Sequence, residues 1–299
     1  MGWCLLLLST TFLFFFKYTK KRDLLHGWSK LLIIFALMFT KPFSYLFSIS
    51  YFGARFKGWA KQPEQPTVEG KVERVLRFVL EERPFRLIGS SRTDSGVSCR
   101  KGYLQLFVEE AIAFEELLPT INIHLGGEIR LDTVQEVPRD FTLIQSVQQK
   151  TYRYYFAQPE GFHPFASSFI AAVPFANALV QMQENGQLFV GRHNFKAFCQ
   201  PSATKLSYER EVESVSVFEE SNSPAINSPA QVFGVEVVGK GFLHHQVRKM
   251  VYAIWNWNAV QIQERLENPE GNWTPVPTAP ANGLVLWDTV LEKSADLEY

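Results

Sequence analysis

The sequence predicts a fold of alternating helices and strands, arranged as one large domain or as two halves that share a cleft. Short stretches in which apolar and polar residues alternate predict half-buried strands, and longer stretches with apolar residues three or four positions apart predict helices. A chain of 299 residues, 46% of them hydrophobic, is also long enough to bury a sizeable core.

The expected elements alternate along the chain from residue 44 onward. A strand is expected at residues 44–51, then a loop with two glycines at residues 51–59, and then a helix that Thr67 can cap. This helix has one apolar stripe, which we interpret as core packing: Val68, Val72, Val75, Leu76, Val79 and Leu80. Further strands are expected at residues 85–90, 102–108, 129–137, 150–157, 211–218, 231–238 and 284–291, and further helices at residues 114–124, 175–190 and 246–266.

Residues 1–43 form a hydrophobic and basic prefix. Its apolar runs, residues 3–16 and 31–39, are both shorter than the roughly 18 residues of a membrane-spanning helix. Six Lys or Arg residues and one acid lie before residue 43. The composition favours an organelle-targeting segment and a mitochondrial location. One alternative is a signal-peptide core or membrane anchor, which would bring residues 1–43 to a membrane. The other is an unreliable start of the reading frame, which would leave the protein in the cytosol.

The cysteines and histidines do not form the patterns of a disulfide framework or a metal site. Cys4, Cys99 and Cys199 are few and scattered, with no C-x-x-C pair, which fits an intracellular, reducing compartment. His244 and His245 are adjacent, so on a strand their side chains would point to opposite faces and would not share an ion. We therefore expect no bound metal.

The net charge argues against a nucleic-acid partner, although the distribution of charge allows one. Residues 43–299 contain 24 basic and 29 acidic residues, a net charge of −5, whereas a domain that grips a phosphate backbone is expected to be basic. The basic residues are nevertheless grouped, and a positive cleft results if the groups converge in the fold. The groups are Arg55, Lys57 and Lys61; Arg92, Arg100 and Lys101; Lys150 and Arg153; Arg192, His193 and Lys196; and Lys240, Arg248 and Lys249.

The most informative motif is Arg92-Thr93-Asp94-Ser95-Gly96, which lies between two expected strands. A carboxylate placed between a cation and a turn-forming glycine is held in a fixed position, and Arg92 is the first candidate for its ion-pair partner. Ordinary turn chemistry is the alternative, since Asp, Ser and Gly are all common in turns.

Two further segments contain side chains suited to binding a base or an acid. In residues 150–155, Tyr152 and Tyr154 lie on one face of the expected strand. The segment is either a half-exposed edge strand or a surface on which a base stacks. Stacking of a base on an aromatic ring contributes roughly 1–3 kcal/mol to binding. In residues 239–250, a glycine-flanked turn leads into a helix with Arg248 near its first turn. A cation there opposes the helix dipole, so we expect another group to hold it.

Six motifs, taken in order, resemble those of the TruA-type tRNA pseudouridine synthases. They are Y-x-G at residues 51–53, R-T-D-x-G-V at 92–97, K-T-Y-R-Y at 150–154, G-x-H-x-F at 191–195, G-F-L-x-x-x-V-R at 241–248 and A-P-x-x-G-L-x-L at 279–286. An ordered set is more specific than any one of its members. The resemblance is closest to the short, single-chain eukaryotic tRNA pseudouridine synthase-like proteins, some of which are mitochondrial.

The resemblance implies an activity, a partner and roles for four residues. Family members isomerise a uridine in tRNA, typically in the anticodon arm, to its C-glycoside without a cofactor. Asp94 matches the essential aspartate, which can attack, abstract a proton or stabilise an oxocarbenium-like sugar; these routes stay open. Arg248 matches its ion-pair partner, and Tyr152 matches a tyrosine that stacks on the target base and can help move the C5 proton. Arg92 matches an arginine that helps the base leave its helix.

The resemblance also implies an α+β fold, the pseudouridine synthase fold. We expect two halves, residues 44–146 and 147–299, each a mostly antiparallel sheet backed by helices, with the two sheets meeting at a cleft. Asp94 then comes from the first half, and Tyr152 and Arg248 come from the second. Family members are often homodimers, so a homodimer is a further expectation.

Several positions depart from the family pattern. Phe52, Ala60, Ser98 and Ile144 stand where the family usually has Asp, Gln, His and Arg, and the region at residues 255–260 is shorter. These changes leave the catalytic positions intact but remove RNA contacts. The sequence therefore supports two hypotheses: an active RNA-modifying isomerase, or a homologue that binds RNA without efficient catalysis.

Overall fold

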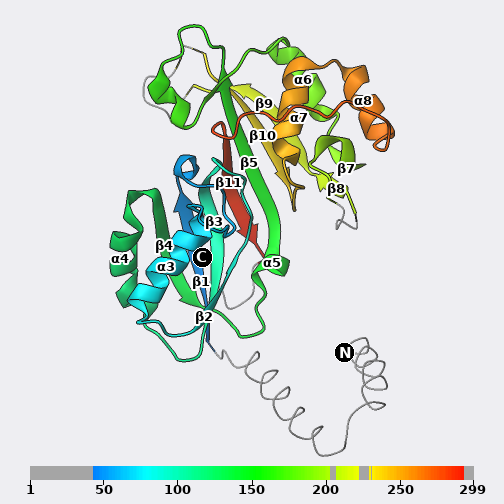
Figure 1. Ribbon diagram of the computed structural model, residues 1–299. Coiled ribbons are helices and arrows are strands. Elements are labelled where there is room, and N and C mark those ends of the chain that lie inside the picture. Colours follow the sequence, from blue (N-terminus) through cyan, green and yellow to red (C-terminus); the bar gives the residue numbers. More distant parts are fainter. Residues whose placement is uncertain (1–42, 203–206, 222–228, 230, 293–299) are drawn as a thin grey trace, which may run out of the picture.

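The computed structural model describes residues 43–202, 207–221, 229 and 231–292, so the prefix and Cys4 lie outside the described residues. The described chain forms two stacked parts, and the long strands β5 (Val147–Ala157) and β11 (Leu284–Leu291) extend into both of them (Figure 1). Within the described ranges, we find no helix that combines the length and the apolar character needed to cross a bilayer.

Nine strands of the described chain form one mixed sheet. Its main order is β4 (Ile129–Glu136), β1 (Phe43–Tyr51), β3 (Ser98–Val108), β11, β5, β10 (Phe233–Gly239) and β9 (Ser214–Glu219). Two short strands extend it, β2 (Phe85–Gly89) beside β3 and β6 (Ala171–Ala172) beside β5. A separate antiparallel pair consists of β7 (Gly191–Asn194) and β8 (Glu209–Val212).

The expectation of two separate sheets is corrected by strand β11. This strand pairs antiparallel with β5 along most of its length and parallel with β3 at Val285–Ser98 and Leu286–Cys99. The two parallel pairs bridge the sheets of the two expected halves, so the α+β protein has one continuous sheet. The division at residues 146 and 147 stays a prediction.

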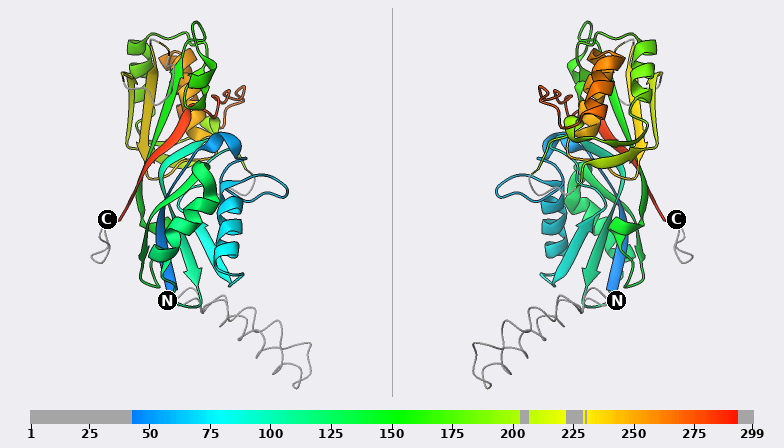
Figure 2. Two further views of the ribbon diagram at one scale, coloured as in Figure 1. Left: turned by 90° about the vertical axis from the view of Figure 1, so that its left-hand side faces the viewer. Right: turned by 90° about the vertical axis from the view of Figure 1, so that its right-hand side faces the viewer.

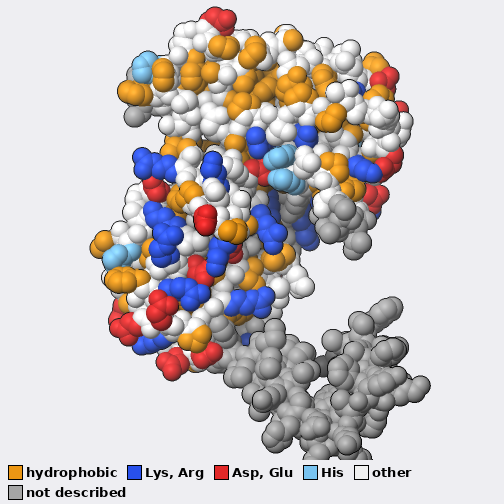
Figure 3. Space-filling model, viewed as in Figure 1, with side chains coloured by type: hydrophobic (Ala, Val, Ile, Leu, Met, Phe, Trp, Pro, Cys, Tyr) orange, Lys and Arg blue, Asp and Glu red, His pale blue; other side chains and the backbone are white. Residues whose placement is uncertain are grey.

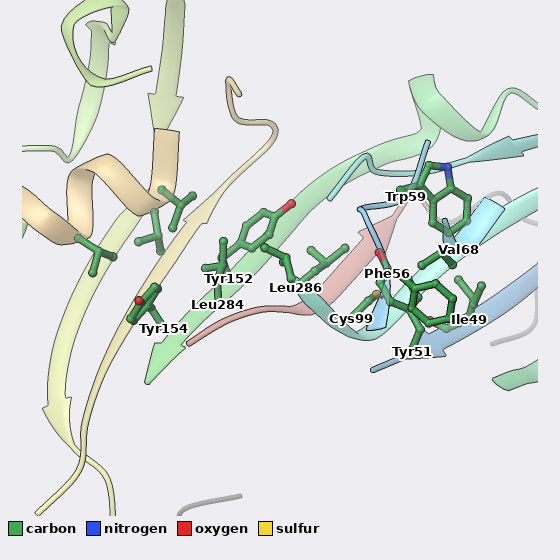
Figure 4. Packing of buried hydrophobic residues seen from close by; sticks show 14 of the residues in the cluster. Ile49, Tyr51, Phe56, Trp59, Val68, Cys99, Tyr152, Tyr154, Leu284 and Leu286 are labelled. Atoms are coloured by element: carbon green, nitrogen blue, oxygen red, sulfur yellow. The ribbon is translucent and has the colours of Figure 1, made fainter. Parts of the chain in front are cut away.

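Four helices from the two parts pack on one face of this sheet (Figure 2). They are α3 (Val68–Val79), α4 (Phe114–Leu125), α6 (Leu179–Gln187) and α7 (Gln246–Asn256). Phe47 of β1 contacts Phe114 of α4 with ring centroids 5.2 Å apart, and Tyr154 of β5 contacts Trp255 of α7 at 5.3 Å. Figure 4 shows buried side chains in a row across both parts, with Leu286 between Tyr154 and the first part. The largest hydrophobic cluster therefore extends through both parts.

Two expected helices differ in extent from the sequence prediction: one is interrupted and the other starts late. The helix expected at residues 246–266 is two helices, α7 and α8 (Ala259–Glu267), because Trp257 is extended and Asn258 begins α8 with a capping box. The helix expected at residues 175–190 is only α6. The Asn177 amide donates to two carbonyls at the end of α7, at 2.9 and 2.8 Å, and so holds the preceding segment in a loop.

The remaining expected elements are confirmed, with ends shifted by a few residues, apart from the strand at residues 211–218. That strand is divided into β8 and β9 at Glu213, whose N–H donates to the Val238 carbonyl at 2.8 Å. Strands β6 and β7 and several short helical turns were not expected. The turns are α5 (Leu143–Ser146), η1 (Gly53–Arg55), η2 (Gly126–Glu128), η3 (Pro164–Ser168) and η4 (Lys196–Phe198).

Candidate active site

Asp94 lies on the loop that joins β2 to β3, and neighbouring segments hold this loop from both sides. The Tyr51 hydroxyl, at the end of β1, shares a hydrogen bond of 2.8 Å with Thr93 Oγ1. The Trp59 N–H donates to the Thr93 carbonyl at 3.1 Å. Gly96 has a φ of 83°, which glycine adopts without strain, and there the chain turns into β3. The loop therefore fixes the backbone of Asp94, whose side chain is 17% exposed.

Arg248 of α7 is an ion-pair partner of Asp94. Its Nη1 donates to Asp94 Oδ2 at 3.1 Å, and its Nε donates to the Ala279 carbonyl at 2.7 Å. The Arg248 side chain is only 13% exposed. The two acceptors fix the orientation of the guanidinium. The negative charge of Asp94 offsets the unfavourable interaction of Arg248 with the dipole of α7, in whose first turn it lies.

His244 and His245 also face Asp94, contrary to the expectation that they point to opposite faces of a strand. His245 has a left-handed backbone, with a φ of 62°, and directly precedes α7. The two imidazole rings lie side by side with centroids 3.9 Å apart. Their Nε2 atoms are 3.5 Å and 3.6 Å from the two carboxylate oxygens of Asp94. Burial lowers the pKa of His245, and the Asp94 carboxylate opposes this shift only in part.

Tyr152 of β5 lines the same cleft. Its ring is buried and contacts the Phe242 ring edge to face, with centroids 5.4 Å apart. Burial raises the pKa of the Tyr152 hydroxyl well above its usual value, and the nearby Cys99 and Asp94 add to this effect. The phenol therefore remains protonated at neutral pH. Tyr154, expected on the same face, lies in the core, and its hydroxyl donates to the Pro280 carbonyl at 2.7 Å.

The cleft that contains these residues has a volume of about 1040 Å³. Lys150 lies in its wall, where Nζ donates to the Ser90 carbonyl at 2.9 Å and burial lowers the pKa of the amine to about 8. The buried Ser91 hydroxyl has no hydrogen-bond partner among the described residues. Arg92 is exposed and lines the cleft. The cleft thus offers cations to a ligand.

The basic groups of the sequence converge only in part. Each of four groups contributes one side chain to the cleft: Lys57, Arg92, Lys150 and Arg248. Figure 3 shows further Lys and Arg side chains on the same face, over the part that contains α3. Arg100 and Arg153 instead stack on Trp287, on the other face of the sheet, at 4.7 and 4.2 Å. Although residues 43–299 have a net charge of −5, the protein has a basic surface around the cleft.

The positions that depart from the family pattern fall into two classes. Ala60 and Ile144 line the cleft, and Ile144 is 62% exposed, so both positions present an apolar side chain to the cleft. Ser98 is buried, and its hydroxyl accepts the Gly53 N–H at 2.9 Å. Phe52 packs against Phe169 with ring centroids 5.4 Å apart, outside the cleft. Two of the four departures therefore affect packing and two affect the ligand surface.

Sequence reasoning missed the histidine pair and the support that Tyr51 gives to the Asp94 loop. A signal for the pair was present, since His244 and His245 directly precede the helix that contains Arg248. The two side chains point in the same direction because His245 has a left-handed backbone. Histidine adopts this conformation only occasionally. The sequence places Tyr51 in a motif, but no pattern predicts its hydrogen bond to Thr93.

The fold and the site define the class of protein. A single carboxylate held by an arginine, beside an aromatic ring in a basic cleft, is suited to an enzyme that acts on a nucleotide base removed from its stack.

The comparisons identify the family. Residues 186–290 match the family model described as tRNA pseudouridine synthase. The chain is 32% identical over 212 residues to tRNA pseudouridine synthase A 2 of Bacillus cereus, covering 71% of this chain and 82% of the relative. It is 27% identical over 244 residues to tRNA pseudouridine synthase A of Listeria innocua serovar 6a, covering 80% and 95%. The chain belongs to the TruA-type tRNA pseudouridine synthase family.

Among solved structures, the chain is similar to one in an H/ACA ribonucleoprotein bound to a substrate RNA containing 2'-deoxyuridine. The alignment covers 76% of this chain and 45% of that chain, with 11% identity and a TM-score of 0.30. This likeness is too weak to bear on the fold.

Proposed function

We propose that the protein isomerises uridine to pseudouridine in the anticodon arm of tRNA, with Asp94 as the catalytic residue. One observation carries the assignment of Asp94. Among the described residues that line the cleft, Asp94 is the one acid, and its carboxylate is paired with Arg248 at 3.1 Å. Membership of the family supports the reaction and the class of RNA.

The reaction needs one bond broken and one bond formed on the same sugar. The bond between N1 and C1' of uridine breaks, the base turns, a bond between C5 and C1' forms, the proton leaves C5, and N1 gains a proton. Asp94 either forms a transient bond to the nucleoside or stabilises the positive charge that develops on the sugar. Arg248 holds the carboxylate at that position and supplies its counter-charge.

Tyr152 and the cations are proposed to hold the target base in the cleft. The Tyr152 ring lines the cleft and is suited to stack with the target base, and the raised pKa of its hydroxyl keeps that group protonated and able to donate a hydrogen bond. Arg92, exposed at the cleft, is placed to contact the RNA from which the base has moved. Such contacts offset the few kcal/mol that base flipping costs.

Mapping of pseudouridine in unmodified tRNA transcripts tests the proposal. After incubation with the protein, carbodiimide treatment and reverse transcription, we expect new stops in the anticodon arm. A protein that shifts tRNA in a gel but gives no stops on any transcript contradicts the enzyme assignment and favours a homologue that binds RNA without catalysis. The exposed Ile144 side chain, where the family usually has Arg, is the observation that favours this second function.

The remaining proposals concern location and assembly, and they rest on the sequence. We propose that residues 1–43 direct the protein to mitochondria, that it resembles the short eukaryotic members of the family, and that it forms a homodimer. Fusing residues 1–43 to a fluorescent protein tests the first proposal, and a cytosolic or membrane-bound signal contradicts it. Sedimentation of the full-length chain tests the last, and a monomer at micromolar concentration contradicts it.

A further inference from the structure

The histidine pair and the catalytic carboxylate have the chemistry and the spacing of metal ligands. One ligand atom each from Asp94, His244 and His245 can be chosen so that all three lie within 4.8 Å of one another. The two distances between an imidazole Nε2 and a carboxylate oxygen are 3.5 and 3.6 Å. Ligands at 2.0–2.1 Å from a tetrahedral zinc ion are about 3.3 Å apart. The two imidazole–carboxylate distances, to Oδ1 and to Oδ2, are already close to this value, and the ligand atoms within 4.8 Å of one another need to approach by at most about 1.5 Å.

The local fold keeps both imidazole rings on the same side. The left-handed backbone of His245 reverses the alternation that two neighbours on a strand would show. Two bonds fix this turn: the Gln246 side chain accepts the Leu243 N–H at 2.8 Å, and the His244 carbonyl accepts the Gln200 N–H at 2.9 Å. The two ring nitrogens are therefore directed at Asp94 before any ligand arrives.

Other groups near the cluster determine how a metal ion would bind. Arg248 contacts Asp94 Oδ2, whereas the nearer oxygen for His244 is Oδ1. His245 lies next to Oδ2, the oxygen that Arg248 contacts, so a metal ion held by both imidazoles would compete with the guanidinium for the carboxylate. The neighbouring Lys249 amine is turned away and donates to the Val276 carbonyl. His244 is 58% exposed, so the cluster is open to solvent and water can complete the coordination.

We propose that Asp94, His244 and His245 bind one divalent transition metal ion of the zinc class, and that the bound ion inhibits the enzyme. Two imidazoles and one carboxylate are a donor set that suits Zn²⁺ and its neighbours rather than Mg²⁺ or Ca²⁺. An ion bound to Asp94 removes the carboxylate from the reaction. The inhibition rests on the proposed function, whereas the binding does not.

Direct binding is tested with the full-length chain after EDTA treatment and dialysis. Zn²⁺ is titrated by calorimetry, and Co²⁺ is followed by the visible absorption of a low-coordinate complex. H244Q and H245Q are each expected to raise the dissociation constant at least about tenfold. H124Q, which removes an exposed histidine on α4, is expected to bind as the wild type does. Equal affinity of the wild type, H244Q and H245Q would overturn the site.

Inhibition is tested by tritium release from C5-labelled uridine in tRNA. Zn²⁺ is expected to stop release by the wild type, EDTA is expected to restore it, and H244Q is expected to need at least about tenfold more Zn²⁺ for the same fractional inhibition. Undiminished release at a Zn²⁺ concentration that saturates the site would overturn the inhibitory role. If the metal-free protein releases no tritium, the proposed function fails while the Co²⁺ spectrum still reports on the site.

Discussion

The hydrogen bond between Tyr51 and Thr93 is expected to hold the Asp94 loop in place. Both residues are buried, at 6% and 7% exposure, and the bond length is 2.8 Å. Burial raises the pKa of Tyr51 well above its usual value, so the hydroxyl stays protonated and can donate. Tyr51→Phe removes this hydroxyl and leaves the ring in its place beside Trp59, where the centroids are 6.0 Å apart.

The magnitude follows from the Thr93 hydroxyl that is left without its partner. A buried polar group that loses its partner costs about 1–3 kcal/mol, so we expect Tyr51→Phe to lower the free energy of unfolding by about 2 kcal/mol. Thr93→Val removes this partner from the Tyr51 hydroxyl and leaves it only the weakly bonding Cys99 thiol, so it is expected to cost a similar amount, about 2 kcal/mol. The double variant contains neither hydroxyl, so no polar group of this pair stays buried without its partner, and it should cost less than the sum of the single variants by at least about 1 kcal/mol.

Urea unfolding followed by tryptophan fluorescence measures this difference. Thr93→Ser is the matched control, because it keeps the hydroxyl and removes only a methyl group, at about 0.8 kcal/mol. If the double variant loses the full sum of the two single losses, the bond contributes no coupling, and the reasoning about the loop is refuted.

Three further predictions test other parts of the structure by the same unfolding assay. Arg248→Met leaves the half-buried Asp94 without its cation and should cost about 2 kcal/mol, with Arg248→Lys intermediate; wild-type stability of the Met variant contradicts the ion pair. Lys150 has a pKa of about 8 in the folded protein and 10.5 in the unfolded chain. Between pH 8 and pH 10.5, the amine of Lys150 is therefore protonated to a greater extent in the unfolded state than in the folded state. Wild-type stability should therefore rise from pH 8 to 10.5, by up to about 3 kcal/mol relative to Lys150→Met, and a constant difference between the two proteins would exclude a neutral buried amine. Gly283→Ala places a Cβ 2.6 Å from a core tyrosine ring and should cost about 1–3 kcal/mol, whereas Gly127→Ala meets no atom within 4 Å; equal losses contradict the close approach.

Local elements were predictable because their signals are local. The apolar stripe of α3 and its Thr67 cap are both present in the sequence, and the Thr67 hydroxyl accepts the Gly70 N–H in the structure. The late start of the helix expected at residues 175–190, which begins only at Leu179, was not predictable. It depends on contacts of Asn177 with the end of α7, about 80 residues later in the chain, and no local pattern reports them.

The site shows the same division between local and distant signals. Ordered motifs identified Asp94, Tyr152 and Arg248, and the structure places all three at one cleft. The continuous sheet depends on two parallel pairs between β11 and β3, which join residues nearly two hundred positions apart. The direction of the two imidazoles depends on one left-handed residue, His245. Periodicity in the sequence does not report distant pairing or the backbone conformation of a single residue.

The most direct test of Asp94 as the catalytic residue is tritium release from C5-labelled uridine in bulk tRNA. We expect release by the wild type and none above background by Asp94→Asn, which keeps the shape of the side chain and removes its charge. Asp288→Asn is the control, because Asp288 pairs with Lys101 outside the cleft, and it should release tritium like the wild type. Equal release by the wild type and Asp94→Asn would contradict the assignment, and no release by the wild type would contradict the proposed reaction.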